Sequence, residues 1–413
     1  MAIVDLDSHL RDGWLLDEIY RLPEPFAKYS PRRIGDGKYF YSRFEHDLSP
    51  LEDPVANANF KKPVTHQVFY NPEANQRGNE VMRWQRGGYD MEYRLQDNAR
   101  EGIDFQLIFP TQIDIPSQNP GALGAALARS YNDWSHRLVS GYRDRLSPVA
   151  MIAAGCPEEM PNELRRCVGE LGCKAAHLVS YTKDKQMDDP VFFPFYQAAE
   201  EFDVPLFCHP STLGDAGTLI NRQSHFFPMH ILGRPLNCVA PLVAMVLGGI
   251  FEKFPRLKVV FFEVTAEFLV FWMHRMDDDY EVIKDAGMCP QLNMLPSEYV
   301  KRNCYITCEA DEKWLPLALA EVGETHVLMA TDYPHFDSTF PKTVSGIRER
   351  PDISPKQKKT DSRRQRAKSN PCVKEYVIHC EVIHDLRFLT ENEKDYHRFL
   401  TMTLWWFVIP ACF

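Results

Sequence analysis

The sequence predicts an α/β fold, a (β/α)8 barrel of the TIM type with a long insertion after its first strand. Three observations lead to this prediction: eight short apolar runs occur along the chain, helix-like segments separate most of them, and the runs show no polar alternation. Unbroken apolar strands are typical of parallel sheets covered by helices. The usual length of such a barrel suits residues 1–355.

The elements follow in a regular order. We expect strands at 3–7, 105–110, 149–153, 175–179, 204–209, 258–263, 305–308 and 326–332. The clearest helical patterns lie at 121–142, 194–202 and 241–255. A doubly wound open sheet is the main rival. Its dinucleotide-binding version is disfavoured, because no glycine fingerprint follows any of the strands.

Residues 10–100 do not follow this alternation of strands and helices. They are rich in Pro, Asn, Arg, Tyr and Phe and show no convincing strand–helix repeat. Long loops inside a compact domain are usually functional or disordered, and the aromatic content argues against disorder. We therefore expect an insertion that covers the mouth of the barrel, within one domain over residues 1–358.

Composition excludes several classes of protein. Hydrophobic residues make up 44% of the 413 residues and charged residues 25%, as in soluble globular proteins. The net charge of −10 argues against nucleic acid or an anionic membrane as a partner. The 11 cysteines form no CxxC pair, so we expect a reducing, cytoplasmic setting. The charged N-terminus and the lack of a long apolar run predict neither a signal peptide nor a membrane helix.

Residues that bind metals occur at the ends of several predicted strands. Asp7 and His9 end the first strand and project to one side, because residues two apart in a strand share a face. His209, Glu263 and Asp332 end the fifth, sixth and eighth strands. A lone Asp-x-His is more often a surface turn than a ligand pair, and a lone His at a strand end is more often a structural histidine. Since C-terminal strand ends meet at one mouth of a barrel, the set predicts a site for Zn2+, Mn2+ or Fe2+.

The stretches DLDSH, FCHPS and ATDYPH resemble the amidohydrolase-related metal enzymes. The resemblance is to the branch that includes aminocarboxymuconate-semialdehyde decarboxylase and the resorcylate-type decarboxylases, and it covers residues 2–358. It implies a barrel in which Asp7, His9, His209 and Asp332 hold a divalent metal, with Zn2+ as first choice. It also implies that Asp332 doubles as the acid/base group, and that the protein is a homodimer.

Two positions depart from the family pattern. The first-strand pair is commonly His-x-His or Glu-x-His, and here it is Asp7-x-His9. Many decarboxylases carry a catalytic His at the end of the sixth strand, where this chain has Glu263. Glu263 is open to three interpretations: a general base, a ligand of a second metal, or a structural acid. Asp12 and His335 are candidates for a second metal site.

The predicted function is a metal-dependent decarboxylase or hydrolase acting on a small carboxylated aromatic or unsaturated compound. In the first case Asp332 would protonate the carbon that loses CO2, and in the second Asp332 or Glu263 would take a proton from water. His225 is a further catalytic candidate, for which a place in the pocket and the start of an amphipathic helix are equally favoured, whereas for His230 the helix start is favoured. The alternatives are a two-metal hydrolase or oxygenase, and a non-catalytic structural subunit of a hetero-oligomer.

The sequence of residues 359–413 differs from the C-terminal sequence that the family resemblance implies. Family members usually finish with a helix like SPKQKELILGGNAARLY, whereas this chain reads SPKQKKTDSRRQR. The codons ACT GAT TCT CGG CGG CAA CGC encode TDSRRQR, and the same bases read one position later encode LILGGN. We hypothesise that a frameshift near residue 359 replaced the last helix. A basic linker leading to a partner-binding segment is the rival.

Overall fold

The computed structural model describes residues 3–12, 15–35, 38–44, 47–51, 84–180, 182, 185–210, 226–288, 292–335 and 337–354. Nine short strands form its parallel sheet, in two hydrogen-bonded arcs. The first arc has the order β1-β6-β2, with β7 also on β6, and the second has the order β12-β11-β10-β9-β8. The strands are β1 (Val4–Asp5), β2 (His9–Leu10), β6 (Phe105–Pro110), β7 (Leu146–Pro148), β8 (Ala176–Leu178), β9 (Leu206–Cys208), β10 (Val259–Phe261), β11 (Cys304–Cys308) and β12 (Val327–Met329).

Single-residue bridges link the two arcs on both sides. Ser8, between β1 and β2, pairs with Tyr333 beyond β12, and Ala150 beyond β7 pairs with Ala176 of β8. Both bridges are parallel, so the strand order is the one expected of a barrel with β1 and β2 as its first strand. The predicted α/β class is confirmed. The hydrogen-bonded ladder is nevertheless two arcs joined by bridges and not a continuous barrel.

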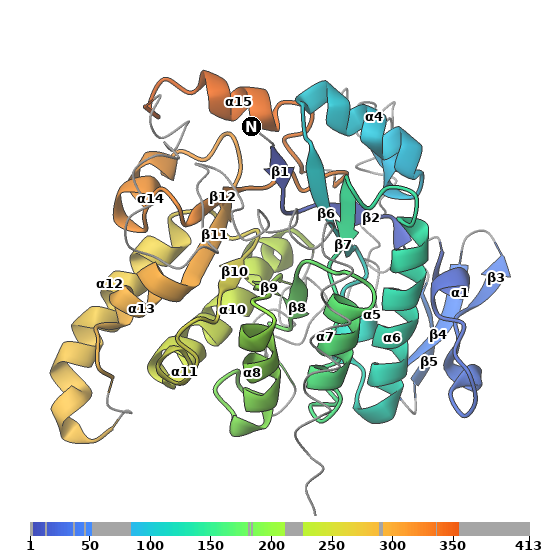
Figure 1. Ribbon diagram of the computed structural model, residues 1–413, viewed down its shortest axis with the longest axis horizontal. Coiled ribbons are helices and arrows are strands. Elements are labelled where there is room, and N and C mark those ends of the chain that lie inside the picture. Colours follow the sequence, from blue (N-terminus) through green and yellow to red (C-terminus); the bar gives the residue numbers. More distant parts are fainter. Residues whose placement is uncertain are drawn as a thin grey trace, which may run out of the picture.

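Helices lie outside the strands (Figure 1). They are α1 (Leu16–Ile19), α4 (Met91–Glu101), α5 (Asp114–Gln118), α6 (Gly121–Leu138), α7 (Met160–Gly169), α8 (Phe193–Glu201), α10 (Phe226–Leu247), α11 (Ile250–Lys253), α12 (Phe268–Ile283), α13 (Pro296–Asn303), α14 (Leu315–Glu321) and α15 (Thr343–Glu349). Single 3-10 turns are η2 (Ala27–Tyr29), η3 (Gln85–Gly88), η4 (Pro190–Phe192) and η5 (Lys284–Ala286). The predicted helices at 121–142 and 194–202 are confirmed, and the one at 241–255 is the end of α10 plus α11.

The two faces of the strands build separate parts of the core. On β9, Leu206 and Cys208 pack in one large cluster with the covering helices, whereas Phe207 packs in a second cluster with Val260 of β10 and Leu328 of β12. Alternate side chains of a strand point to opposite faces, which explains the division. Both faces are covered, and β9, β10 and β12 are apolar throughout, so the polar residues that follow these three strands stand out.

The third strand lies earlier than predicted. We expected it at 149–153, but β7 is Leu146–Pro148, and the following residues contribute only the bridge at Ala150. Neighbouring strands of a barrel are staggered, so β7 pairs with β6 first and reaches β8 further along. The apolar run continues beyond the ladder because 149–154 stay buried.

The region 10–100 contains more regular structure than the sequence indicates. Helix α4 follows η3 and precedes β6, as an ordinary strand-connecting helix does. Its buried face includes Arg94, Asp97 and Asn98, so its pattern lacks the apolar period of a core helix. Three antiparallel strands, β3 (Arg32–Gly35), β4 (Lys38–Phe44) and β5 (Asp47–Leu51), lie beside α1 in Figure 1. Residues 52–83 lie outside the described part, so the cover over the mouth stays a prediction.

One described helix passes a membrane-span criterion of length and apolarity, over His230–Leu247 of α10. The buried share of that window is 39%, and core helices of globular proteins pass the same test. Cys238, Leu242 and Met245 on this helix are fully buried in the large core cluster. The finding is therefore weak evidence for a membrane.

Candidate metal centre

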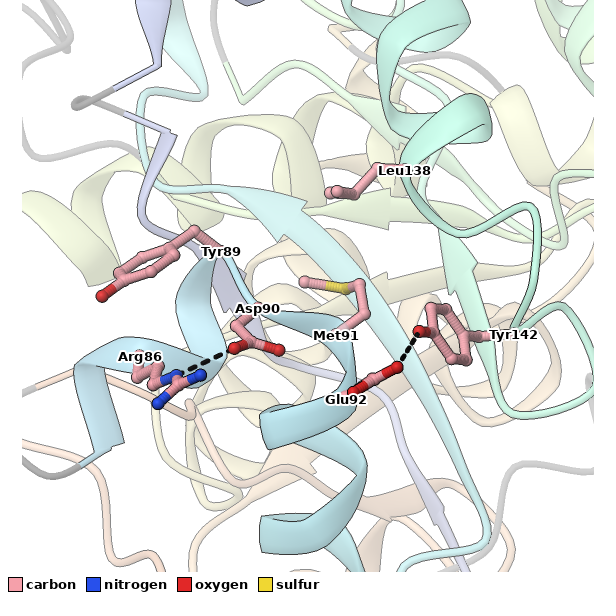
Figure 2. Close-up of a pocket in the computed structure, with 7 residues that line it drawn as sticks. All are labelled: Arg86, Tyr89, Asp90, Met91, Glu92, Leu138 and Tyr142. Carbon is pink, nitrogen blue, oxygen red and sulfur yellow. Dashed lines mark hydrogen bonds and ion pairs between the residues drawn. The ribbon is translucent and has the colours of Figure 1, made fainter.

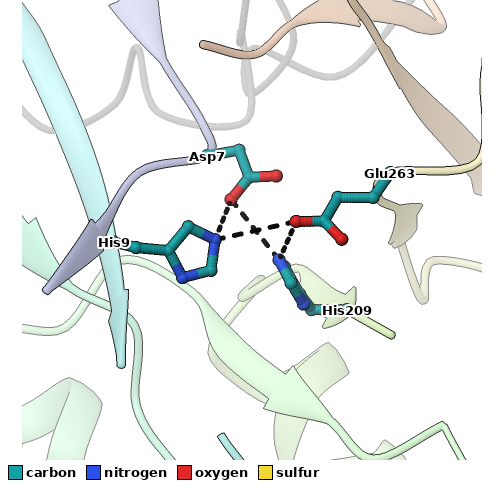
Figure 3. A group of neighbouring side chains, drawn as sticks. All are labelled: Asp7, His9, His209 and Glu263. Carbon is teal, nitrogen blue, oxygen red and sulfur yellow. Dashed lines mark ion pairs between the residues drawn. The ribbon is translucent and has the colours of Figure 1, made fainter. Parts of the chain in front are cut away.

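Four side chains from three strand ends converge on one point (Figure 3). His9 Nε2 lies 3.1 Å from Asp7 Oδ1 and 3.9 Å from Glu263 Oε1. His209 Nε2 lies 3.5 Å from each of the same two oxygens. All four ligand atoms lie within 4.8 Å of one another. The first, fifth and sixth strand ends therefore do meet, as the sequence predicted.

A second group overlaps the first. His9, Glu263, Asp332 and His335 also have ligand atoms within 4.8 Å of one another. Asp332 Oδ1 lies 3.3 Å from His9 Nε2 and 2.7 Å from His335 Nδ1. The eighth strand end thus joins the same centre. The structure thus brings Asp7, His9, His209 and Asp332 to one centre, together with Glu263 and His335, which the sequence had suggested for a second metal.

The backbone is strained at both carboxylates that follow the strands. Glu263 has φ 54° and Asp332 has φ 53°, in the left-handed region that residues with a side chain rarely occupy. Such a conformation costs about 1–3 kcal/mol and persists where the surroundings impose it. Strain of this kind clusters at functional sites, and here it coincides with two of the three acids that face the histidines.

The orientation of the two imidazoles suits metal binding. His209 Nδ1 lies 2.8 Å from Pro210 O, and His9 Nδ1 lies 3.4 Å from Pro110 O. A carbonyl oxygen only accepts, so each Nδ1 carries the proton and each Nε2 presents a lone pair to the centre. A carbonyl behind a histidine fixes the tautomer in this way at metal sites.

The ligand atoms lack hydrogen-bond partners, which tests whether a metal fits. Among the buried polar atoms with no such partner are Asp7 Oδ1, His9 Nε2, His209 Nε2 and Asp332 Oδ1. Leaving buried polar atoms unpaired is costly, so such atoms call for another partner. Two imidazole nitrogens and carboxylate oxygens are donors that a divalent transition metal accepts. The residues therefore fit the predicted divalent metal.

The pKa shifts of the clustered side chains also fit a bound cation. Burial raises the pKa of Asp332 well above its usual value, and the neighbouring Glu263 charge raises it further. Burial alone would lower the pKa of His209, but the Glu263 and Asp7 carboxylates raise it. Burial would raise the pKa of Asp7, and the His209 charge lowers it instead. Carboxylates packed this closely need a cation among them, and a divalent ion supplies one.

A polar network fixes the ligand-bearing turn of the first strand. The buried Arg94 donates to Gly87 O at 2.8 Å, to Ser8 Oγ at 2.9 Å and to Gln106 Oε1 at 2.8 Å, and also to His9 O. Asp5, in the same row as Asp7, does not join the metal ligands. Its carboxylate instead accepts from Gln106 Nε2 at 2.7 Å and from the hydroxyl of Thr331 at 2.6 Å. That contact ties the first strand to the eighth.

The remaining candidates have other roles. Asp12 belongs to neither ligand group and accepts from the backbone of Thr111 at 2.8 Å. The proposal of Asp12 as a second-metal ligand is therefore not supported by its contacts. His230 lies on α10 and contacts Asp337 at 3.1 Å. His225 lies outside the described residues, so its catalytic role stays a prediction.

Sequence reasoning missed the partner of Glu263. Arg234 Nε lies 2.6 Å from Glu263 Oε2, and its Nη1 lies 2.7 Å from His230 Nδ1. The only signal in the sequence is the spacing of four between His230 and Arg234, which places both on one face of a helix. That Glu263 lies against this face follows only from the packing of α10 near β10.

A separate surface cavity of about 710 Å³ lies between η3, α4 and α6. Figure 2 shows its lining, in which Arg86 pairs with Asp90 and the hydroxyl of Tyr142 approaches Glu92. The complete lining is Arg86, Tyr89, Asp90, Met91, Glu92, Leu138 and Tyr142. None of these residues belongs to the two ligand groups, so this cavity is distinct from the metal centre.

Curated relatives of the chain are decarboxylases. The chain is 27% identical over 249 residues to a 2-amino-3-carboxymuconate-6-semialdehyde decarboxylase of Dictyostelium discoideum, covering 60% of this chain and 67% of that protein. It is 27% identical to a gamma-resorcylate decarboxylase of Polaromonas sp. (strain JS666 / ATCC BAA-500), covering 50% of this chain and 65% of that protein. These matches span about two thirds of the length of the relatives.

Solved structures share the fold. A 5-carboxyvanillate decarboxylase from Sphingomonas paucimobilis superposes with a TM-score of 0.61 at 21% identity, over 85% of this chain and 93% of that one. An amidohydrolase from Mycobacterium avium subsp. paratuberculosis K-10 gives 0.65 at 16% identity, over 86% and 95%. The family model described as Amidohydrolase matches residues 53–365, more than half of the chain. The chain therefore belongs to the amidohydrolase family.

Proposed function

We propose that the protein is a metal-dependent decarboxylase of a small carboxylated compound, aromatic or unsaturated. The observation that carries this proposal is the convergence of the buried ligand atoms of Asp7, His9, His209 and Asp332 at the strand ends. The named activities of the curated relatives support the reaction type, because each removes a carboxyl group from a compound of this class.

Asp7, His9, His209 and Asp332 would hold the ion, with Glu263 beside them. When bound, a divalent ion supplies Lewis-acid polarisation and orients a carboxylated ligand. We propose Zn2+ first, because imidazole and carboxylate donors suit it, with Mn2+ and Fe2+ as the next ions to test. A 5-carboxyvanillate decarboxylase structure from Novosphingobium aromaticivorans DSM 12444 has bound manganese, which makes Mn2+ the stronger alternative.

Asp332 is placed to move the proton. In decarboxylation the bond between carbon and carboxyl breaks, its electron pair stays on the carbon, and a proton must reach that carbon as CO2 leaves. Asp332 Oδ1 lies 2.7 Å from His335 Nδ1, and His335 Nε2 lies 3.1 Å from the Thr111 hydroxyl. Thr111 donates that hydroxyl to Leu10 O at 2.6 Å, so it accepts from His335. His335 thus presents an unprotonated Nδ1 that can exchange a proton with Asp332.

A metal-dependent hydrolase is the second candidate. One observation favours it: Glu263 occupies the sixth strand end, where many decarboxylases of the family have a histidine, and its Oε1 lies 3.5 Å from His209 Nε2. A carboxylate there is suited to accept a proton from water. The two candidates differ in product, because decarboxylation releases CO2 and hydrolysis does not.

The test is an assay of CO2 release by the purified protein loaded with Zn2+ or Mn2+. The panel would contain 2,6-dihydroxybenzoate, 5-carboxyvanillate and 2-amino-3-carboxymuconate-6-semialdehyde, with ester and amide analogues for the hydrolase. CO2 release that Asp332→Asn abolishes would support the decarboxylase. Turnover of the esters or amides alone would favour the hydrolase. A metal-loaded protein inactive on both sets would count against both and favour the structural-subunit alternative.

We also propose a cytoplasmic homodimer. The family resemblance supports the dimer, and the cysteines support the compartment, since the seven in the described residues are buried and free. Light scattering after size-exclusion chromatography would measure the assembly state, and a monomeric mass would refute the dimer. Fractionation of the source cells would test the compartment.

A further inference from the structure

A buried guanidinium covers the outer oxygen of Glu263. Oε1 of Glu263 faces the histidines, while Oε2 lies 2.6 Å from Arg234 Nε. The Arg234 side chain is 16% exposed and that of Glu263 is 9% exposed, so little water screens the pair. One oxygen of this carboxylate therefore faces the centre, and the other is held by Arg234.

Arg234 is itself held from the other side. Its Nη1 donates to His230 Nδ1 at 2.7 Å, because a guanidinium only donates. His230 then carries its proton on Nε2, which lies 3.1 Å from Asp337 Oδ2. Arg234 Nη2 lies 3.7 Å from the same oxygen. Helix α10 thus ties Glu263, beyond β10, to Asp337, in the segment that follows β12.

This arrangement bears on the number of metal ions. The two overlapping ligand groups share His9 and Glu263. His9 offers one nitrogen to the centre, so it serves one ion only. A carboxylate with both oxygens free can bridge two ions about 3.5–4 Å apart, and among these residues Glu263 is the acid common to both groups. Its second oxygen is already taken by Arg234.

We propose that Arg234 is a positioning residue that holds the centre to a single divalent ion. It does so by engaging Glu263 Oε2, so that Glu263 offers one oxygen, and by placing a fixed positive charge beside the centre. The inference rests on the proposed metal-binding function. It extends that function by choosing one-metal chemistry over the two-metal hydrolase or oxygenase alternative.

The experiment is a titration of metal-free protein with Mn2+, followed by elemental analysis and electron paramagnetic resonance. Wild-type protein should saturate at one equivalent and show the spectrum of an isolated ion. Arg234→Met removes the charge and frees Glu263 Oε2, so it should take a second equivalent with an exchange-coupled spectrum. Adding Glu263→Gln to Arg234→Met should return the binding to one equivalent.

Two variants control the design. Arg234→Lys keeps a positive charge and should stay at one equivalent. Arg86→Met makes the same substitution at an arginine whose Nε lies 2.8 Å from Asp90, away from the centre, and should also stay at one. Circular dichroism checks that each variant is folded, and Arg234→Gln replaces Arg234→Met if the latter is not.

The titration distinguishes a failure of the proposed role of Arg234 from a failure of the metal-dependent function. Two equivalents in the wild-type protein, or one equivalent in a folded variant with a neutral residue at position 234, would overturn the role of Arg234. No binding at all by the wild-type protein would instead refute the metal-dependent function itself. The wild-type stoichiometry tests the proposal even if every variant at position 234 fails to fold.

Discussion

Replacing Arg94 should weaken both the fold and the metal centre. Its side chain is fully buried and donates to four acceptors, two of which, Ser8 Oγ and His9 O, lie in the ligand-bearing turn. Burial lowers the pKa of the Arg94 guanidinium to about 10, so the group stays charged at neutral pH. Arg94→Met keeps most of the apolar stem and removes the charge and the donors.

The magnitude follows from the contacts. Leaving one buried acceptor without its donor costs about 1–3 kcal/mol, so losing the donor to several acceptors at once costs about 3–5 kcal/mol. With an unfolding entropy of about 2.1 cal/mol/K per residue over roughly 350 residues, this corresponds to a fall in Tm of about 4–7 °C. Scanning calorimetry of the wild-type and variant proteins at the same metal concentration measures it.

A matched control distinguishes the network from the loss of any arginine. Arg275→Met removes a side chain that is 57% exposed and pairs only with Asp279, at 2.8 Å, among the contacts described. Its Tm should change by about 1 °C or less, because exposed ion pairs contribute little. A fall of under 2 °C in Arg94→Met, with unchanged Mn2+ affinity, would show that the guanidinium network does not hold the turn.

Three further outcomes are expected. His209→Ala and Asp332→Asn should each lose the bound metal, and elemental analysis that finds the wild-type content in both would remove these residues from the ligand set. Chelation of the metal should lower the Tm of the wild-type protein but leave that of His209→Ala unchanged, since a ligand bound only by the folded state stabilises it. Burial, with nearby acids such as Asp337, raises the pKa of Glu309 to about 8 from 4.5. The stability that the protonated Glu309 contributes is therefore complete below pH 4.5 and is lost as the pH rises through 8. Between pH 6 and pH 9 the Tm of Glu309→Gln should fall less than the Tm of the wild-type protein. An equal fall in both proteins would assign the pH dependence to another group.

The convergence of the strand-end side chains could be predicted because it depends on local pattern. A strand buried on both faces is apolar throughout, so a carboxylate or imidazole at its end is conspicuous in the sequence. Parallel strands place their C-terminal ends at one edge, which brings Asp7, His9, His209 and Asp332 together whatever the loops do. The structure confirms that convergence.

Other features were hidden because they depend on residues far apart in sequence. Helix α4 escaped prediction since its buried face is polar, and that face is satisfied only by groups such as Ser8 and Gln106. Asp5 shares the period of Asp7, yet Thr331 engages its carboxylate instead of the metal centre. Periodicity gives the direction of a side chain and not the identity of its partner.

The sequence by itself determined the alternation of strands and helices, the α/β class and the residues at the strand ends, because each depends on the period of side chains along a single element. The tertiary structure alone decided which atoms of those residues meet. The proton positions on His9 and His209 depend on the carbonyls of Pro110 and Pro210, and the outer oxygen of Glu263 depends on Arg234. These contacts arise from the packing of strands and of helix α10 around the centre, which no local pattern contains.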